Sequence, residues 1–155
     1  MTHYEKKIIR ELKEKGYVVV PNYISKNECN EIISKIDFCI EKYKKNIWSD
    51  ENFSDQRIFG SEIISKQIEK YHYDKQLHKI GEKYVGYKMK NLMTMANKVS
   101  FKNFNKGSGG GWHKDAYYNQ FKSILYLNEI FDENGPFELI ENSNKILNTL
   151  DISFK

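Results

Sequence analysis

A histidine and an aspartate two residues apart, His113 and Asp115, are the side chains of this sequence best suited to chemistry. On a β-strand, residues i and i+2 point to the same face with their bases ~7 Å apart, so both side chains can converge on one ion. An imidazole and a carboxylate are two of the three ligands in the 2-His-1-carboxylate site of non-haem Fe(II) oxygenases, which leaves positions open for co-substrate and dioxygen. The pair predicts a metal site, with a metal-free hydrogen-bonded pair as the alternative.

The same His-x-Asp pattern occurs earlier, at His72 and Asp74, in a different context. Leu77, Ile80 and Tyr84 follow it at the spacing of one helix face. Asp74 suits the N-cap of that helix, because its carboxylate can accept hydrogen bonds from the first backbone N–H groups. We therefore interpret His72 as a surface or packing residue.

The surroundings of His113 are unlike those of the first copy. Glycines dominate residues 107–111, and glycine inside a strand pattern marks a bulge or the close approach of a ligand or backbone. Trp112 and Tyr117, with Tyr118, are candidates to line a substrate opening, and aromatic packing around a sheet explains them equally well.

Composition limits the class of protein. The 155 residues carry a net charge of +4, and we expect a single domain, residues 1–155, that buries ~68–70% of its unfolded surface. Lysines and glutamates are interspersed, which argues against a nucleic acid as the main partner, since a phosphate-binding face needs clustered cations. No apolar run approaches ~20 residues, and residues 1–7 lack a signal-peptide core.

The two cysteines, Cys29 and Cys39, fall in one predicted helix. Ten helical residues separate them by ~15 Å along the axis, too far for a disulfide bond. We expect both to be reduced, as in a reducing compartment. Together with the absence of membrane signals, this predicts a soluble, cytoplasmic protein without a membrane partner.

The first half of the chain predicts helices. Residues 4–15 have an amphipathic pattern that ends at Gly16. Ser25 and Glu28 match a capping box, in which each side chain accepts from a backbone N–H of the other residue, at the start of a second helix. Residues 61–86 resume helical spacing.

The remaining segments predict strands and loops. The β-branched run 17–20 before Pro21 indicates a first strand, and residues 46–60 lose periodicity, which indicates a long surface loop. Extended segments are expected within 87–105, 121–127 and 137–140, with a turn at residues 132–136. This order favours an α+β chain whose catalytic part is a jelly roll.

Several motifs, in order, resemble the phytanoyl-CoA dioxygenase-like family of Fe(II)/2-oxoglutarate oxygenases. They are Gly-Tyr-Val-Val-Val, Ser-Lys-Asn-Glu, Gly-Trp-His-Lys-Asp, Lys-Ser-Ile-Leu-Tyr-Leu-Asn-Glu-Ile, Glu-Asn-Gly-Pro-Phe and Glu-Asn-Ser-Asn-Lys. The resemblance implies a double-stranded β-helix, a cupin-like jelly roll, with the N-terminal helices packed outside it. His113 and Asp115 match the first histidine and the carboxylate of the family's iron triad.

The chain departs from the family pattern after Asp115. Members close the triad with a second histidine and anchor 2-oxoglutarate with a following arginine, whereas no histidine or arginine follows Asp115 here. Asn144 stands where the family often has a loop histidine. We therefore expect a domain incomplete at its C-terminus, with no third protein ligand, and unpaired strand edges that favour self-association.

The resemblance implies Fe(II), 2-oxoglutarate and dioxygen as cofactor and co-substrates, and hydroxylation of a small-molecule substrate. A cation on a pocket strand is a suitable partner for the 2-oxoglutarate carboxylate, which makes Lys122 a candidate, with a solvent-facing lysine as the alternative. Arg57 is expected to form a salt bridge with Asp55 or Glu62. Two other functions remain open: a catalytically inactive jelly-roll binding or scaffold protein, and a cupin-like enzyme that uses another divalent metal.

Overall fold

The computed structural model describes residues 1–101, 112–116 and 118–145. Its helices are α1 (His3–Lys15), α2 (Lys26–Lys42), α3 (Lys66–His72) and α4 (Lys75–Val85), with short 3-10 turns η1 (Ser61–Ile63) and η2 (Asp132–Asn134). Its strands are β1 (Trp48–Ser49), β2 (Asp55–Phe59) and β3 (Met95–Val99). The described part of the chain is thus α+β, as expected.

Side-chain caps begin the helices where the sequence predicts them. Asp74 accepts hydrogen bonds from Gln76 N and Leu77 N at the start of α4, which confirms its role as an N-cap. Ser25 caps α2 by accepting from Glu28 N. The predicted reciprocal half of that capping box is absent, because the Glu28 carboxylate instead accepts hydrogen bonds from the side chains of two α3 residues, Lys70 and Tyr71.

The sheet is small, open and antiparallel, with strand order β1-β2-β3. Trp48 pairs with Arg57, and Arg57 pairs in turn with Asn97. The prediction of a surface loop over residues 46–60 was wrong, since both β1 and β2 lie there. The turn between them is held by Asp50, whose carboxylate accepts from Ser54 N, Asp55 N and the Ser54 hydroxyl.

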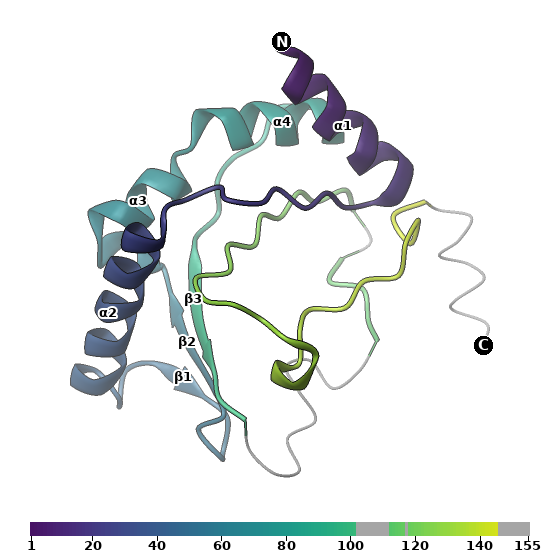
Figure 1. The fold of residues 1–155 in the computed structure, drawn as a ribbon. Helices are drawn as coiled ribbons and strands as arrows, with labels where there is room; N and C mark the ends of the chain where they lie inside the picture. The colour runs from purple at the N-terminus through teal and green to yellow at the C-terminus, as the bar shows by residue number, and fades with distance from the viewer. Residues whose placement is uncertain (102–111, 117, 146–155) are drawn as a thin grey trace.

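Buried apolar side chains form two clusters. One joins α2 to the sheet and α3, and its members are Ile32, Ile36, Cys39, Ile40, Ile58, Ile68 and Ala96. The other joins α1 to α4 through Ile8, Ile9, Leu12 and Ile80. Figure 1 shows α1 and α4 together at one end, and α2 running alongside the sheet. Cys29 and Cys39 both lie on α2 as free thiols, which confirms the sequence prediction.

The jelly-roll prediction was wrong: the described residues form one open three-stranded sheet and no double-stranded β-helix. Residues 17–20, 121–127 and 137–140, all expected as strands, carry no strand in the structure. The physical reason is that a strand needs a hydrogen-bonded neighbour, which alternation of side chains along one segment does not supply. In Figure 1 the segment 118–145 lies across β3 from α2, in green and yellow.

Phe121 attaches this C-terminal segment to the helical end. Its ring packs against the α1–α4 cluster and lies 6.4 Å from the Tyr84 ring, centroid to centroid. Gly81 on α4 makes the approach possible, because a Cβ there would collide with Phe121 and Met89. The segment therefore reaches the core through a side-chain contact, without a sheet ladder.

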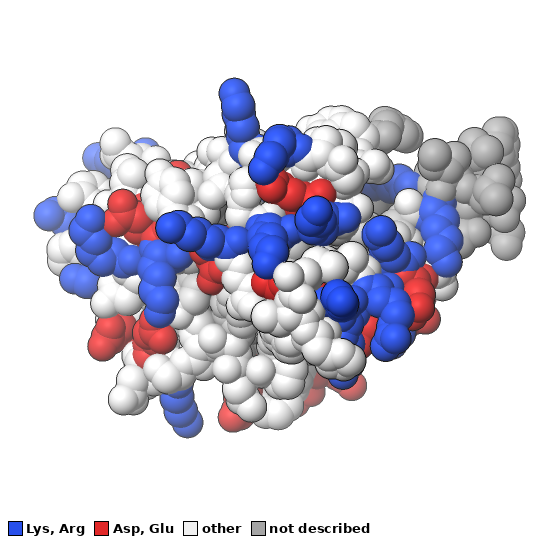
Figure 2. All heavy atoms as spheres, turned by 90° about the horizontal axis from the view of Figure 1, so that it is seen from above, with Lys and Arg blue, Asp and Glu red and all other residues white. Residues whose placement is uncertain are grey.

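Charge is distributed over the face seen from above in Figure 2, where basic side chains predominate and acidic ones lie between them. Basic and acidic side chains form ion pairs, both between helices and within one helix. Lys79 on α4 contacts Glu5 on α1 at 2.9 Å, and Lys7 contacts Glu11 within α1 at 4.0 Å. Among the described helices, none is both long and apolar enough to cross a membrane.

Candidate functional site

His113 and Asp115 meet in the structure, although their backbone is irregular and not the predicted strand. The His113 Nε2 atom lies 3.2 Å from Asp115 Oδ1. Both side chains are about half exposed, at 52% and 50%. The two side chains therefore come into contact, as their spacing predicted. They do so from irregular backbone and not from one face of a strand.

The other oxygen of Asp115 is held by Lys122, whose Nζ lies 2.5 Å from Oδ2. The hydrogen bond from this ammonium lowers the pKa of Asp115 below its ordinary value, against a smaller opposing effect of desolvation. Asp115 is therefore a carboxylate at neutral pH, which is the protonation state that a metal ligand needs. Lys122 was expected on a strand facing a co-substrate; it lies outside the strands and contacts Asp115.

The spacing of the two donor atoms can be tested against a metal. Two ligands that occupy adjacent positions of an octahedral ion, each ~2.1 Å from it, lie ~3.0 Å apart. The observed 3.2 Å between Nε2 and Oδ1 fits this value. An imidazole with a monodentate carboxylate is also the donor set of a non-haem iron site. The same distance suits an N–H···O hydrogen bond between the two side chains, so it is compatible both with a shared ion and with a metal-free pair.

A third protein ligand is not assembled in the described part of the chain, where no group of three His, Cys, Asp or Glu side chains is placed to hold a metal. His72 Nδ1 lies 2.9 Å from the Thr94 hydroxyl, and His78 lies 4.0 Å from Glu82. The His-x-Asp pattern at residue 72 is therefore structural, with His72 on Thr94 and Asp74 capping α4, which confirms the earlier interpretation.

Of the other residues that the sequence singled out, the structure describes Trp112, Tyr118 and Arg57. Trp112 is 65% exposed, and Tyr117 lies outside the described residues. Arg57 forms the expected salt bridge with Asp55 at 2.6 Å and stacks on the Trp48 ring at 4.7 Å, so it serves the sheet. Among the described residues, the structure brings Lys122 to the pair of His113 and Asp115, and it leaves Trp112 exposed.

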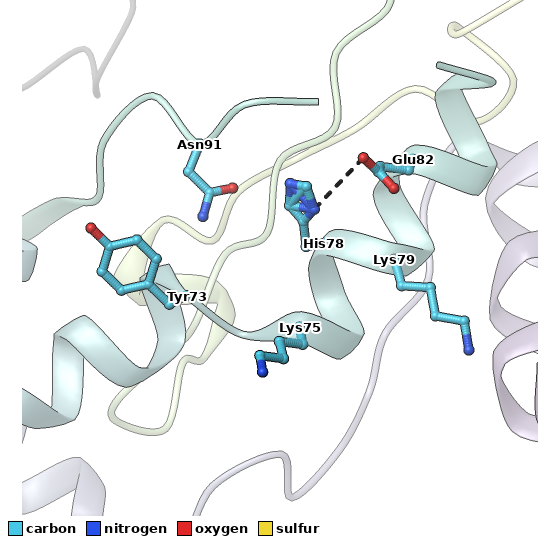
Figure 3. A pocket seen from close by; sticks show the side chains of 6 residues that line it. All are labelled: Tyr73, Lys75, His78, Lys79, Glu82 and Asn91. Carbon is cyan, nitrogen blue, oxygen red and sulfur yellow. Dashed lines mark ion pairs between the residues drawn. The ribbon is translucent and has the colours of Figure 1, made fainter. Parts of the chain in front are cut away.

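A small cavity of about 320 Å³ lies elsewhere, at the junction of α3 and α4. Figure 3 shows His78 between Asn91 and Glu82, with Tyr73 on the side of His78 that faces away from Glu82. Glu82 Oε1 also accepts a hydrogen bond from Met89 N, and its Oε2 lies 3.3 Å from Lys88. Through these contacts the Glu82 carboxylate joins α4 to the segment that follows it. We therefore assign Glu82 a structural role and do not place the functional site in this cavity.

A wider groove of about 620 Å³ lies where the starts of α2 and α4 meet the end of α3. Tyr23 donates to Asp74 at 2.7 Å, and Tyr71 donates to Glu28 at 2.9 Å. Burial, reinforced by the bond to Asp74, raises the pKa of Tyr23 well above its ordinary value. The sequence did not reveal these tyrosine–carboxylate pairs, because the two partners are 51 residues apart in one pair and 43 in the other. Paired in this way, the groups fasten the helix ends together.

Comparisons with protein-family models, with curated proteins and with solved structures found nothing that matches this chain. The functional argument therefore depends on the geometry of His113, Asp115 and Lys122 and on the motifs in the sequence.

Proposed function

We propose that this chain provides the imidazole and the carboxylate of a non-haem Fe(II) site in a 2-oxoglutarate-dependent oxygenase that hydroxylates a small molecule. The observation that carries the proposal is the 3.2 Å distance between His113 Nε2 and Asp115 Oδ1, the spacing of adjacent ligands on one ion. The ordered motifs that resemble the phytanoyl-CoA dioxygenase-like family support the choice of iron and of 2-oxoglutarate.

Each side chain has a defined task under this proposal. His113 presents Nε2 as a neutral donor, and Asp115 presents Oδ1 as an anionic donor. Bound iron would supply the redox chemistry that activates dioxygen for attack on an unactivated C–H bond. An ammonium has three N–H donors, so Lys122 retains donors beyond the one directed to Asp115 Oδ2, and these suit a carboxylate of the co-substrate.

The competing explanation is a metal-free ion pair. Asp115, His113 and Lys122 satisfy one another electrostatically without any metal, and all three are about half exposed, so the pairing itself contributes little to stability. A binding or scaffold protein needs nothing more from these residues. The two explanations differ in whether a divalent ion enters between Nε2 and Oδ1.

An anaerobic titration with Fe(II), with and without 2-oxoglutarate, tests the proposal. We expect a saturable visible charge-transfer band that needs both components and is lost in His113→Ala and in Asp115→Ala. His72→Ala is the matched control, because it removes the histidine of the other His-x-Asp pattern and should keep the band. Folded protein that gives no band contradicts the proposal and favours the metal-free function.

A further inference from the structure

The Asp115 carboxylate has a different partner on each oxygen: His113 on Oδ1 at 3.2 Å and Lys122 on Oδ2 at 2.5 Å. Rotation about the terminal bond of an aspartate side chain meets only a broad, roughly two-fold barrier. The Asp115 side chain is 50% exposed, and its two oxygens are chemically equivalent. What the two polar partners determine is therefore the plane of the carboxylate and how many of its oxygens are left for another ligand.

The two contacts are unequal in their ability to fix the carboxylate. The Lys122 contact is a short, charge-assisted hydrogen bond, which is the stronger kind. The His113 contact is longer, and a metal entering between Nε2 and Oδ1 would replace it. Only the Lys122 contact can be kept when an ion binds, because it uses the oxygen that faces away from the imidazole.

We infer that Lys122 is a positioning residue, which holds the plane of the Asp115 carboxylate and occupies one of its two oxygens, so that a single oxygen beside His113 is left for a divalent ion. This inference rests on the proposed function, since it presupposes that an ion binds between His113 and Asp115. It goes further by assigning to Lys122 a task that concerns the metal and not the co-substrate.

Two opposing effects of Lys122 on metal affinity can be compared. Groups that orient a ligand typically contribute 10- to 100-fold to metal affinity. The ammonium also repels the ion. Lys122 is 58% exposed, and in a water-like environment a divalent ion and an ammonium ~4 Å apart repel by about 2 kcal/mol, which changes affinity by about thirtyfold. At low ionic strength the two effects therefore nearly cancel, and removing the ammonium should change the affinity by no more than about threefold.

Salt distinguishes the two effects. Repulsion between exposed charges is screened at high ionic strength, whereas orientation by a short hydrogen bond depends on it less. The deficit caused by removing Lys122 should therefore increase with salt, towards the full 10- to 100-fold. A lysine that only repels the ion would show the opposite sign, with tighter binding in its absence and a difference that shrinks with salt.

The experiment is a titration of the full chain with Co(II), used as a redox-stable spectroscopic probe, at about 20 mM and 500 mM NaCl. We expect Lys122→Met to bind Co(II) within about threefold of the wild type at low salt and about tenfold or more weakly at high salt, where the repulsion is screened. Lys122→Arg, which keeps a cationic donor for Oδ2, should recover most of the affinity. Lys90→Met removes the same charge from another exposed position and should bind as the wild type does.

The outcomes separate this inference from the proposed function. A wild-type chain that binds no Co(II) overturns both. A wild-type chain that binds Co(II), together with Lys122→Met that binds it equally or more tightly at the high salt concentration, overturns the positioning role alone. Circular dichroism and thermal unfolding of each variant establish that it is folded, so that a loss of affinity is not a loss of structure.

Discussion

The two halves of the molecule are built by different interactions. Residues 3–99 contain the four α-helices and the sheet, closed by two buried apolar clusters. Residues 112–145, as far as they are described, contain one 3-10 turn and long extended stretches, yet they carry His113, Asp115 and Lys122. The stable framework and the candidate chemistry therefore lie in different parts of the chain, joined by contacts such as that of Phe121 with the α1–α4 cluster.

Hydrogen exchange should show the largest difference between the halves. Amides inside α2 and β2 donate to backbone partners and open only with much of the fold, so we expect them to exchange roughly a thousand-fold or more slowly than unprotected amides. Amides of residues 122–127 lie in no strand and should exchange close to the unprotected rate. Strong protection of residues 122–127 would mean that this segment pairs with a strand, in the chain or in a second copy.

Truncating an isoleucine should lower the free energy of unfolding by several kcal/mol more in the helical half than in the C-terminal half. Ile80 is 2% exposed within the α1–α4 cluster, so Ile80→Ala should lower the free energy of unfolding by about 2–5 kcal/mol. Ile124 is 57% exposed, and Ile124→Ala should change it by no more than about 0.5 kcal/mol. Chemical denaturation measures both; equal losses would show that residue 124 belongs to a core.

The contact between the halves can be tested at Gly81. Alanine in place of a helical glycine ordinarily stabilises by about 1 kcal/mol, but here the new methyl group would collide with Phe121 and Met89. Overpacking costs about 1–3 kcal/mol, so we expect Gly81→Ala to be neutral or destabilising by up to about 2 kcal/mol.

A double-mutant cycle with Phe121→Ala checks the cause. Gly81→Ala should be better tolerated in the Phe121→Ala background, because one of the two colliding side chains is gone. If the two changes simply add, Phe121 does not approach Gly81 in solution, and the C-terminal segment is attached elsewhere.

Acid should weaken the helical half through Glu5. Its pKa is lowered from 4.5, first by the hydrogen bond from Lys79 and then by that from Thr2 N. A lowered pKa in the folded state stabilises the fold above the unfolded value, and this contribution is lost as pH falls below about 4.5. Glu5→Gln should therefore reduce the drop in Tm between about pH 6 and pH 3.5. Glu14→Gln, at an exposed position of the same helix, is the control and should leave the drop unchanged.

Local signals predicted the framework well. Helix caps such as Asp74 and Gly16 act within a few residues, so their effect can be read from the sequence. Strands were less predictable, because a strand needs a second strand that can be far away in the sequence. Residues 17–20 have the composition of a strand but pair with no strand in the described part of the chain, whereas β2 lies where periodicity is lost. The jelly roll was inferred from such segments and failed for the same reason.

The candidate site was predictable in its members and not in its arrangement. His113 and Asp115 were identified by type and spacing, whereas Lys122 was named as a strand cation for the co-substrate carboxylate and not as a partner of Asp115. That the Lys122 ammonium is directed at Asp115 is a contact between residues seven positions apart, which no period in the sequence encodes.

A thermodynamic cycle of Co(II) affinities tests most directly the claim that His113 and Asp115 bind one ion together. The account predicts that His113→Ala and Asp115→Ala each remove most of the affinity, and that the double variant loses little more, because two ligands of one ion act as a unit. His72→Ala should bind Co(II) as the wild type does. Independent, additive losses, or a wild-type affinity unchanged by either substitution, would contradict it.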